Sequence, residues 1–102
     1  MVCWALRFLT EERSRLSVTA SIVTYLHVRP SSQLDAEKID FLVLLSNRQA
    51  IAFQVKSSPG PKSVHDKKYP YIPCFMESGR SKPESVARRL HAFLAGILAD
   101  AS

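Results

Sequence analysis

The sequence predicts a single mixed α/β domain, and three observations carry this prediction. The chain has 102 residues, of which 46% are hydrophobic, enough for one core but not for a second domain, so residues 1–102 are expected to fold as one unit. Two short apolar runs, Ile39–Leu45 and Ile51–Val55, are typical of buried strands. The last segment repeats its apolar residues at helical spacing.

The first elements along the chain are a helix and a strand. Residues Val2–Arg15 are interpreted as helical, with apolar residues on one part of the surface. The segment Ser17–Val28 is rich in Val, Thr, Ile and Tyr, which predicts a first strand. A helix that continues over Thr10–Ile22 is the alternative. Pro30–Gln33 marks the loop that leads into the second strand.

The two apolar runs are predicted to pair as a hairpin. Gln54 and Lys56 share a face of their strand, because strand side chains alternate between faces. Asp40 joins that face when the connecting loop has an odd length, for example residues 47–49 or 46–50, and leaves it when the length is even. With an odd loop both faces are largely apolar, which predicts a strand pair covered on two sides.

A fourth strand and a second helix complete the chain. The strand is expected at Tyr71–Met76, after a loop that begins at Ser58. Ser81 is predicted to cap the helix, with Pro83 in its first turn and Glu84 completing a capping box. The apolar stripe that should face the sheet contains Val86, Leu90, Phe93, Leu94, Ile97 and Leu98.

Asp40 on one strand and Gln54-Val55-Lys56 on the next resemble the motif of the PD-(D/E)XK nuclease superfamily. The resemblance implies an α/β, restriction-endonuclease-like fold, with a small mixed central sheet of about four strands flanked by an N-terminal and a C-terminal helix. It implies that Asp40 is the main ligand of Mg²⁺ or Mn²⁺, that Gln54 and the Val55 carbonyl complete the metal shell, and that Lys56 is the catalytic lysine. The chain departs from the family at Ile39, where the family has proline, and at Gln54, which replaces an acid and removes one negative charge.

A second acid is expected near this site. Asp35 precedes Asp40 in a polar loop and is the preferred further metal ligand, with Glu37 as an alternative that also fits a surface charge. The family often supplies an acid from its first helix, for which Glu11 and Glu12 are the candidates. Their alternating charge pattern more commonly indicates a solvated helical face.

The charge of the chain favours a polyanionic partner. The net charge is +5, and basic side chains bind phosphates and release counterions. The expected nucleic-acid contacts are Lys62, Lys67, Lys68, Arg88 and Arg89. A plain surface loop and a solvated helix face are the alternatives for these residues.

The two cysteines, Cys3 and Cys74, fit no metal spacing and are expected to be reduced core thiols, which predicts a cytoplasmic protein. The opening apolar run is too short to span a membrane, and no membrane partner is expected. A nuclease of this length is expected to work as a homodimer.

Three hypotheses for function follow. The first is a metal-dependent endonuclease-like hydrolase that cleaves phosphodiester bonds in DNA. The second is a catalytically inactive nucleic-acid-binding or complex-forming module of the same fold. The third is a small interaction protein in which Lys56 forms a structural ion pair with Asp40.

Overall fold

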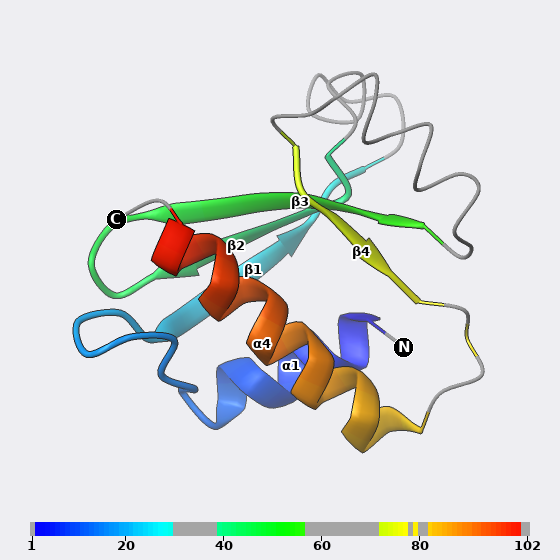
Figure 1. Ribbon diagram of the computed structural model, residues 1–102, viewed down its shortest axis with the longest axis horizontal. Helices are drawn as coiled ribbons and strands as arrows, with labels where there is room; N and C mark the ends of the chain where they lie inside the picture. Colours follow the sequence, from blue (N-terminus) through cyan, green and yellow to red (C-terminus); the bar gives the residue numbers. More distant parts are fainter. Residues whose placement is uncertain (1, 30–38, 57–71, 78, 80–81, 101–102) are drawn as a thin grey trace.

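The computed structural model describes residues 2–29, 39–56, 72–77, 79 and 82–100. Over these residues the chain is an α/β protein with a four-stranded mixed sheet and two helices (Figure 1), as the sequence predicts. In chain order the elements are α1 (Val2–Glu11), β1 (Ile22–His27), β2 (Phe41–Leu45), β3 (Ala50–Lys56), β4 (Cys74–Met76) and α4 (Pro83–Asp100).

The strands lie in the order β1-β2-β3-β4. The first three are antiparallel neighbours, whereas β4 runs parallel to β3. Phe41 lies opposite Phe53, and the backbone amide of Leu45 donates to the Gln49 carbonyl at 2.9 Å. The hairpin loop is therefore residues 46–48. Its length is odd, which is the alternative that places Asp40 on the face of Gln54 and Lys56, although it is neither of the two loops given as examples.

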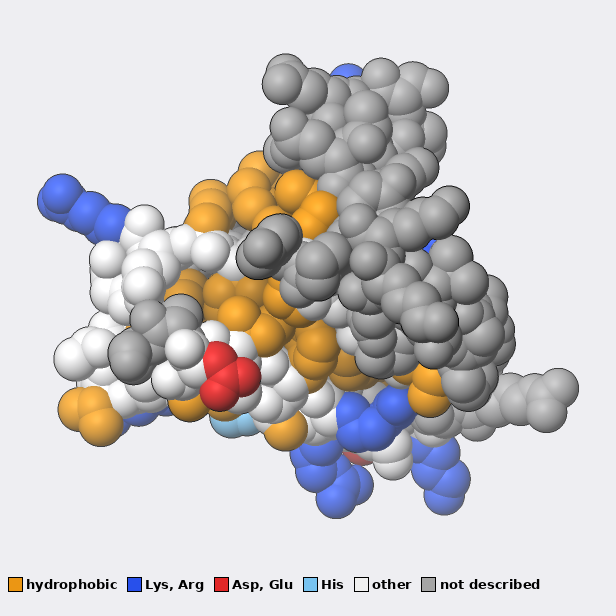
Figure 2. All heavy atoms as spheres, turned by 45° about the horizontal axis from the view of Figure 1, so that its top comes forward, with side chains coloured by type: hydrophobic (Ala, Val, Ile, Leu, Met, Phe, Trp, Pro, Cys, Tyr) orange, Lys and Arg blue, Asp and Glu red, His pale blue; other side chains and the backbone are white. Residues whose placement is uncertain are grey.

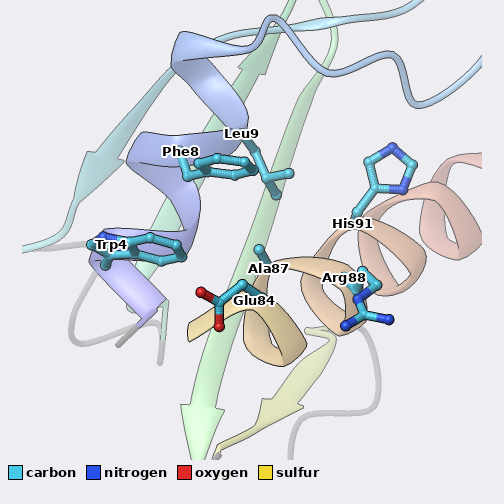
Figure 3. Close-up of a pocket in the computed structure, with 7 residues that line it drawn as sticks. All are labelled: Trp4, Phe8, Leu9, Glu84, Ala87, Arg88 and His91. Carbon is cyan, nitrogen blue, oxygen red and sulfur yellow. The ribbon is translucent and has the colours of Figure 1, made fainter. Parts of the chain in front are cut away.

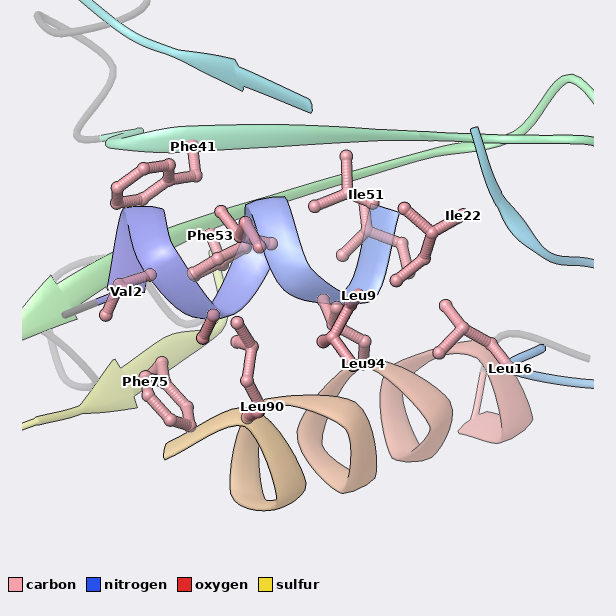
Figure 4. Close-up of a cluster of buried hydrophobic side chains, with 14 of the residues drawn as sticks. Val2, Leu9, Leu16, Ile22, Phe41, Ile51, Phe53, Phe75, Leu90 and Leu94 are labelled. Carbon is pink, nitrogen blue, oxygen red and sulfur yellow. The ribbon is translucent and has the colours of Figure 1, made fainter. Parts of the chain in front are cut away.

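Both described helices lie side by side on the same face of the sheet (Figure 1), and the core fills the space between them and the strands (Figure 4). The buried strand residues of this core are Ile22, Phe41, Val43, Leu45, Ile51 and Phe53, and the buried helix residues include Leu6, Leu9, Leu90 and Leu94.

The opposite face of the sheet is more open. Leu42, Leu44 and Ala52 are only half-buried, and Leu26 is exposed. Figure 2 shows hydrophobic side chains at the surface on this side. Both described helices lie on the other face (Figure 1), so the described helices cover the predicted strand pair on one side only.

The first helix is shorter than predicted because it ends in a Schellman motif. The amide of Ser14 donates to the Leu9 carbonyl and that of Arg13 to the Thr10 carbonyl, both at 3.0 Å, and Arg13 has a φ of 49°. This pattern closes a helix, usually with glycine at the position that Arg13 occupies. The first strand starts at Ile22, which excludes the alternative of a helix through Thr10–Ile22.

The second helix begins at Pro83. Of the predicted stripe, Val86, Leu90, Leu94 and Leu98 are buried, whereas Phe93 and Ile97 are half-buried. The first backbone hydrogen bond of the helix joins the Val86 amide to the Lys82 carbonyl at 3.1 Å, so Lys82 occupies the N-cap position. The sequence pattern predicted the cap at Ser81, so the observed cap lies one residue later. Pro83 takes the first helical position, where its missing amide costs nothing.

Cys3 and Cys74 form no disulfide, and the first is half-buried and the second buried, as predicted. In the part of the chain that the structure describes, no helix is both long and apolar enough to cross a membrane.

Candidate functional site

Asp40 is held in the sheet immediately before β2. Its amide donates to the Phe53 carbonyl at 3.0 Å, and its carbonyl accepts from the Val28 amide at 2.8 Å. Its carboxylate oxygen Oδ2 accepts a hydrogen bond from the amide of Val55 at 2.8 Å. Since Val55 stands between Gln54 and Lys56 in the chain, the carboxylate lies beside the segment that the motif singled out.

Gln54 is a polar residue in the buried part of β3, with 8% of its surface exposed. Its backbone amide donates to the Pro73 carbonyl at 2.9 Å. Its side-chain oxygen Oε1 is buried, and no donor among the described residues reaches it. A buried acceptor without a donor costs about 1–3 kcal/mol, so this oxygen is suited to a cation or a bound water.

Lys56 is the last residue of β3 and is half-buried. It shares a strand face with Gln54, two residues earlier. Its carbonyl accepts a hydrogen bond from the Glu77 amide at 2.8 Å, which fixes its backbone against the end of β4. Within the described ranges the Lys56 ammonium forms no ion pair with Asp40. The structural ion pair of the third hypothesis is therefore not formed.

The oxygens at this site come from one acid and two neutral groups. The second carboxylate oxygen of Asp40 takes part in no hydrogen bond with the described residues. The Val55 carbonyl faces the same side of β3 as the Val55 amide, because both backbone groups of a strand residue point to one neighbour. The second Asp40 oxygen, the Val55 carbonyl and Gln54 Oε1 are three candidate oxygen ligands, and oxygen is the ligand type that Mg²⁺ prefers. No group of three or more His, Cys, Asp and Glu side chains gathers in the described part of the chain.

The helix acids do not join this site. Cys3 Sγ lies 3.7 Å from His27 Nδ1, and His27 pairs with Phe41, so the first turn of α1 lies at the Asp40 end of the sheet. Glu11 is at the other end of α1, where it forms an exposed ion pair with Arg7 at 3.2 Å. Glu12 follows it and is exposed. The interpretation of both acids as part of a solvated face therefore fits the structure.

The predicted basic contacts differ in their surroundings. Arg88 is exposed. Arg89 donates to the buried carboxylate of Glu77 at 2.6 Å and lies over the Phe75 ring, 5.5 Å from its centroid. Lys62, Lys67, Lys68, Asp35 and Glu37 lie outside the described residues.

Sequence reasoning missed Glu77, which is a buried acid with 7% of its surface exposed. Besides Arg89 it accepts a hydrogen bond from the Gly79 amide at 2.7 Å, and Gly79 has a φ of 81° that favours glycine. The sequence signal was an acid close to glycine directly after a strand, which is also the pattern of an ordinary turn.

Comparison with protein family models, with curated proteins and with solved structures finds no match for this chain. The interpretation of the site therefore rests on its own residues.

Proposed function

We propose that this chain is a metal-dependent hydrolase of the restriction-endonuclease-like fold that cleaves phosphodiester bonds in DNA, with Asp40, Gln54 and Lys56 as its site. The observation that carries the proposal is the buried Oε1 of Gln54, which has no hydrogen-bond donor in the described residues. Gln54 directly precedes Val55, whose amide binds the Asp40 carboxylate. A buried oxygen without a donor, two residues before a lysine, is uncommon unless it has a ligand.

The donor set fits a hard divalent cation. Asp40 contributes a carboxylate oxygen, Gln54 its side-chain oxygen and Val55 its carbonyl. Mg²⁺ is commonly bound by one or two carboxylates together with substrate phosphates and water. A single acid therefore suffices when the nucleic acid supplies the remaining negative charge, and the net charge of +5 favours that partner.

Each residue has a distinct part in the proposed reaction. A divalent ion bound at such a site polarises the phosphate and lowers the pKa of a water molecule. Asp40 keeps its carboxylate in place through the Val55 amide, and its second oxygen takes part in no hydrogen bond with the described residues. Lys56 presents its ammonium on the Gln54 side of β3, where it stabilises the negative charge that develops on the phosphate oxygens and orients the attacking water.

The test is a cleavage assay with duplex, single-stranded and branched DNA in Mg²⁺ or Mn²⁺, combined with calorimetric metal titration. Asp40→Asn and Lys56→Met should each abolish cleavage, and Asp40→Asn should also weaken metal binding. Gln54→Glu restores the missing negative charge at the site and should strengthen metal binding. Asp100→Asn, an equivalent change at an exposed acid at the end of α4, is the control. If no substrate is cleaved and no metal binds even with DNA present, the hydrolase proposal fails.

An inactive module of the same fold is the second candidate, and a specific observation favours it. The carboxylate of Asp40 already accepts a hydrogen bond from the backbone of Val55, and no group of three or more His, Cys, Asp and Glu side chains gathers among the described residues. In that case DNA binding should weaken with salt but be indifferent to Mg²⁺ and to Lys56→Met. The same samples, measured by fluorescence anisotropy, distinguish the two candidates.

A further inference from the structure

A groove of about 440 Å³ runs between α1 and α4 on the side of the helices that faces away from the sheet (Figure 3). One wall is formed by Trp4, Phe8 and Leu9 of α1. The other is formed by Glu84, Ala87, Arg88 and His91 of α4. None of Asp40, Gln54, Val55 and Lys56 lines this groove, so its role does not depend on the proposed hydrolytic site; Arg88, an expected nucleic-acid contact, does line it.

The α1 wall carries two aromatic side chains, Trp4 and Phe8, that do not belong to the core. The rings of Trp4 and Phe8, four residues apart on the helix, stack with centroids 5.5 Å apart and an angle of 8° between their planes. They remain 44% and 42% exposed. The buried face of the same helix, Val2, Ala5, Leu6 and Leu9, already packs in the core. A helix that is apolar on a second side usually covers that side with another element.

The α4 wall carries two opposite charges one helical turn apart. Glu84 and Arg88 are four residues apart, a spacing that commonly forms an ion pair. They form none here, with each other or with any other described residue. On α1, by contrast, Arg7 and Glu11 have the same spacing and do pair, at 3.2 Å. The two α4 charges therefore remain available to a partner.

His91 closes the end of this wall and is fixed in place. Its Nε2 donates to the carbonyl of Arg15 at 2.9 Å, which ties α4 to the segment after α1. The two walls are therefore held in position relative to one another, by this bond as well as by the core beneath them. A groove held in this way is preorganised for its ligand.

We propose that the groove binds an amphipathic helix of a partner protein. Apolar side chains of that helix, at positions i, i+3 or i+4, and i+7, pack on Trp4 and Phe8. A basic residue of the helix faces Glu84, and an acidic residue one turn away faces Arg88. A helix fits because it presents two charges at the same one-turn separation as the wall, and because it extends the layer that α1 and α4 already form.

A second copy of the chain matches this chemistry less well. The exposed positions of α4 are small or charged: Arg88, Arg89, Ala92, Gly96, Ala99 and Asp100 among those lying beyond its first turn. In the described part of the chain, α1 is the helix with exposed aromatic residues, and those residues form the groove wall itself. A foreign helix with its own apolar stripe is therefore the better occupant.

The chain contains a single tryptophan, so the fluorescence of Trp4 reports directly on the groove. Three synthetic helical peptides serve as probes, each with the same leucine stripe. They differ at two surface positions four residues apart. The mixed peptide has one Lys and one Glu there, the second peptide has two Lys and the third has two Glu. The mixed peptide should shift the Trp4 emission to shorter wavelength and bind at least about tenfold more tightly than the other two. Whatever the order of its Lys and Glu, the mixed peptide can lie in one direction that places Lys at Glu84 and Glu at Arg88.

Charge reversal in the protein provides the matched test. Glu84→Arg should transfer the preference to the two-Glu peptide, and Arg88→Glu should transfer it to the two-Lys peptide. Glu12→Arg, a reversal at an exposed acid that does not line the groove, should leave the preference unchanged. Phe8→Ala should lower the affinity for the mixed peptide by about tenfold or more, as measured by calorimetry. Circular dichroism checks that the substituted protein keeps its fold.

Three results would overturn the proposal. The first is an unchanged Trp4 emission with all three peptides, and the second is a charge preference that the reversals do not move. The third is a Trp4 shift that depends on protein concentration without peptide, which would mean that a second copy covers the groove.

Discussion

The carboxylate oxygen Oδ2 of Asp40 lies 2.8 Å from the backbone nitrogen of Val55 and accepts its hydrogen bond. In a regular antiparallel ladder a backbone carbonyl takes this place. Here a side chain does so, at the point where β2 begins. The same residue therefore has a structural role, through one oxygen, and a proposed chemical role, through its charge and its other oxygen.

Substitution can separate these two roles. Asp40→Ala removes the acceptor and leaves the Val55 amide unpaired, so we expect a loss of about 1–3 kcal/mol in the free energy of unfolding. Asp40→Asn retains an acceptor oxygen and should lose less than half as much. Urea denaturation followed by circular dichroism measures both. Equal losses for Ala and Asn would mean that the charge of Asp40, and not its hydrogen bond, stabilises the fold.

The sequence was sufficient to predict the hairpin and the C-terminal helix because both depend on local periodicity. The alternation in β2 and β3 determines which residues share a face once the loop is odd, and this parity is enough to put Asp40 on the face of Gln54 and Lys56. The helical stripe from Val86 to Leu98 likewise follows from spacing alone.

The features that the sequence did not predict depend on contacts between distant segments. Arg13 ends α1 with a positive φ, although glycine is the usual residue there. The two helices occupy one face of the sheet, a choice that two apolar strand faces leave open. Glu77 is buried because Arg89, on α4, lies close enough to pair with it. Spacing within one element contains none of this information.

The buried Oε1 of Gln54 leads to a second prediction. Gln54→Met has a similar shape but no polar atom, so it removes an acceptor that lacks a donor in the described residues. In chelator-treated protein it should leave the free energy of unfolding unchanged or raise it by up to about 1 kcal/mol. Thermal unfolding with and without Mg²⁺ is the measurement. In the wild type, but not in Gln54→Met, added Mg²⁺ should raise the melting temperature. A clear loss of stability in metal-free Gln54→Met would show that the Gln54 side-chain amide, through its oxygen or its nitrogen, has a stabilising partner.

The ion pair between Glu77 and Arg89 leads to a third prediction. The Glu77 side chain is 4% exposed and that of Arg89 is 45% exposed. Arg89→Met strands a buried carboxylate, which we expect to cost about 2–3 kcal/mol, below the value for a pair buried on both sides. Arg88→Met, the same change at the preceding exposed arginine, should cost no more than about 0.5 kcal/mol.

A double-mutant cycle isolates this pair. Glu77→Gln combined with Arg89→Met should recover part of the loss, because the buried group is then neutral. Equal destabilisation by Arg88→Met and Arg89→Met would mean that neither the ion pair with Glu77 nor the contact with Phe75 contributes to stability.

The two cysteines give a fourth prediction, on local stability at the edge of the sheet. Cys3 is half-buried in the first turn of α1, whereas Cys74 is buried and lies in the short strand β4, next to the site segment Gln54–Lys56. A thiol reagent reaches a buried cysteine only when its surroundings open. Under native conditions Cys3 should therefore react at least about tenfold faster than Cys74, as followed by mass spectrometry of the labelled peptides. In concentrated urea the two rates should converge, and Cys3→Ser should leave the Cys74 rate unchanged. Equal rates in the native protein would show that β4 separates from β3 without global unfolding, in which case the strand that anchors Lys56 is too mobile to hold a preformed hydrolytic site.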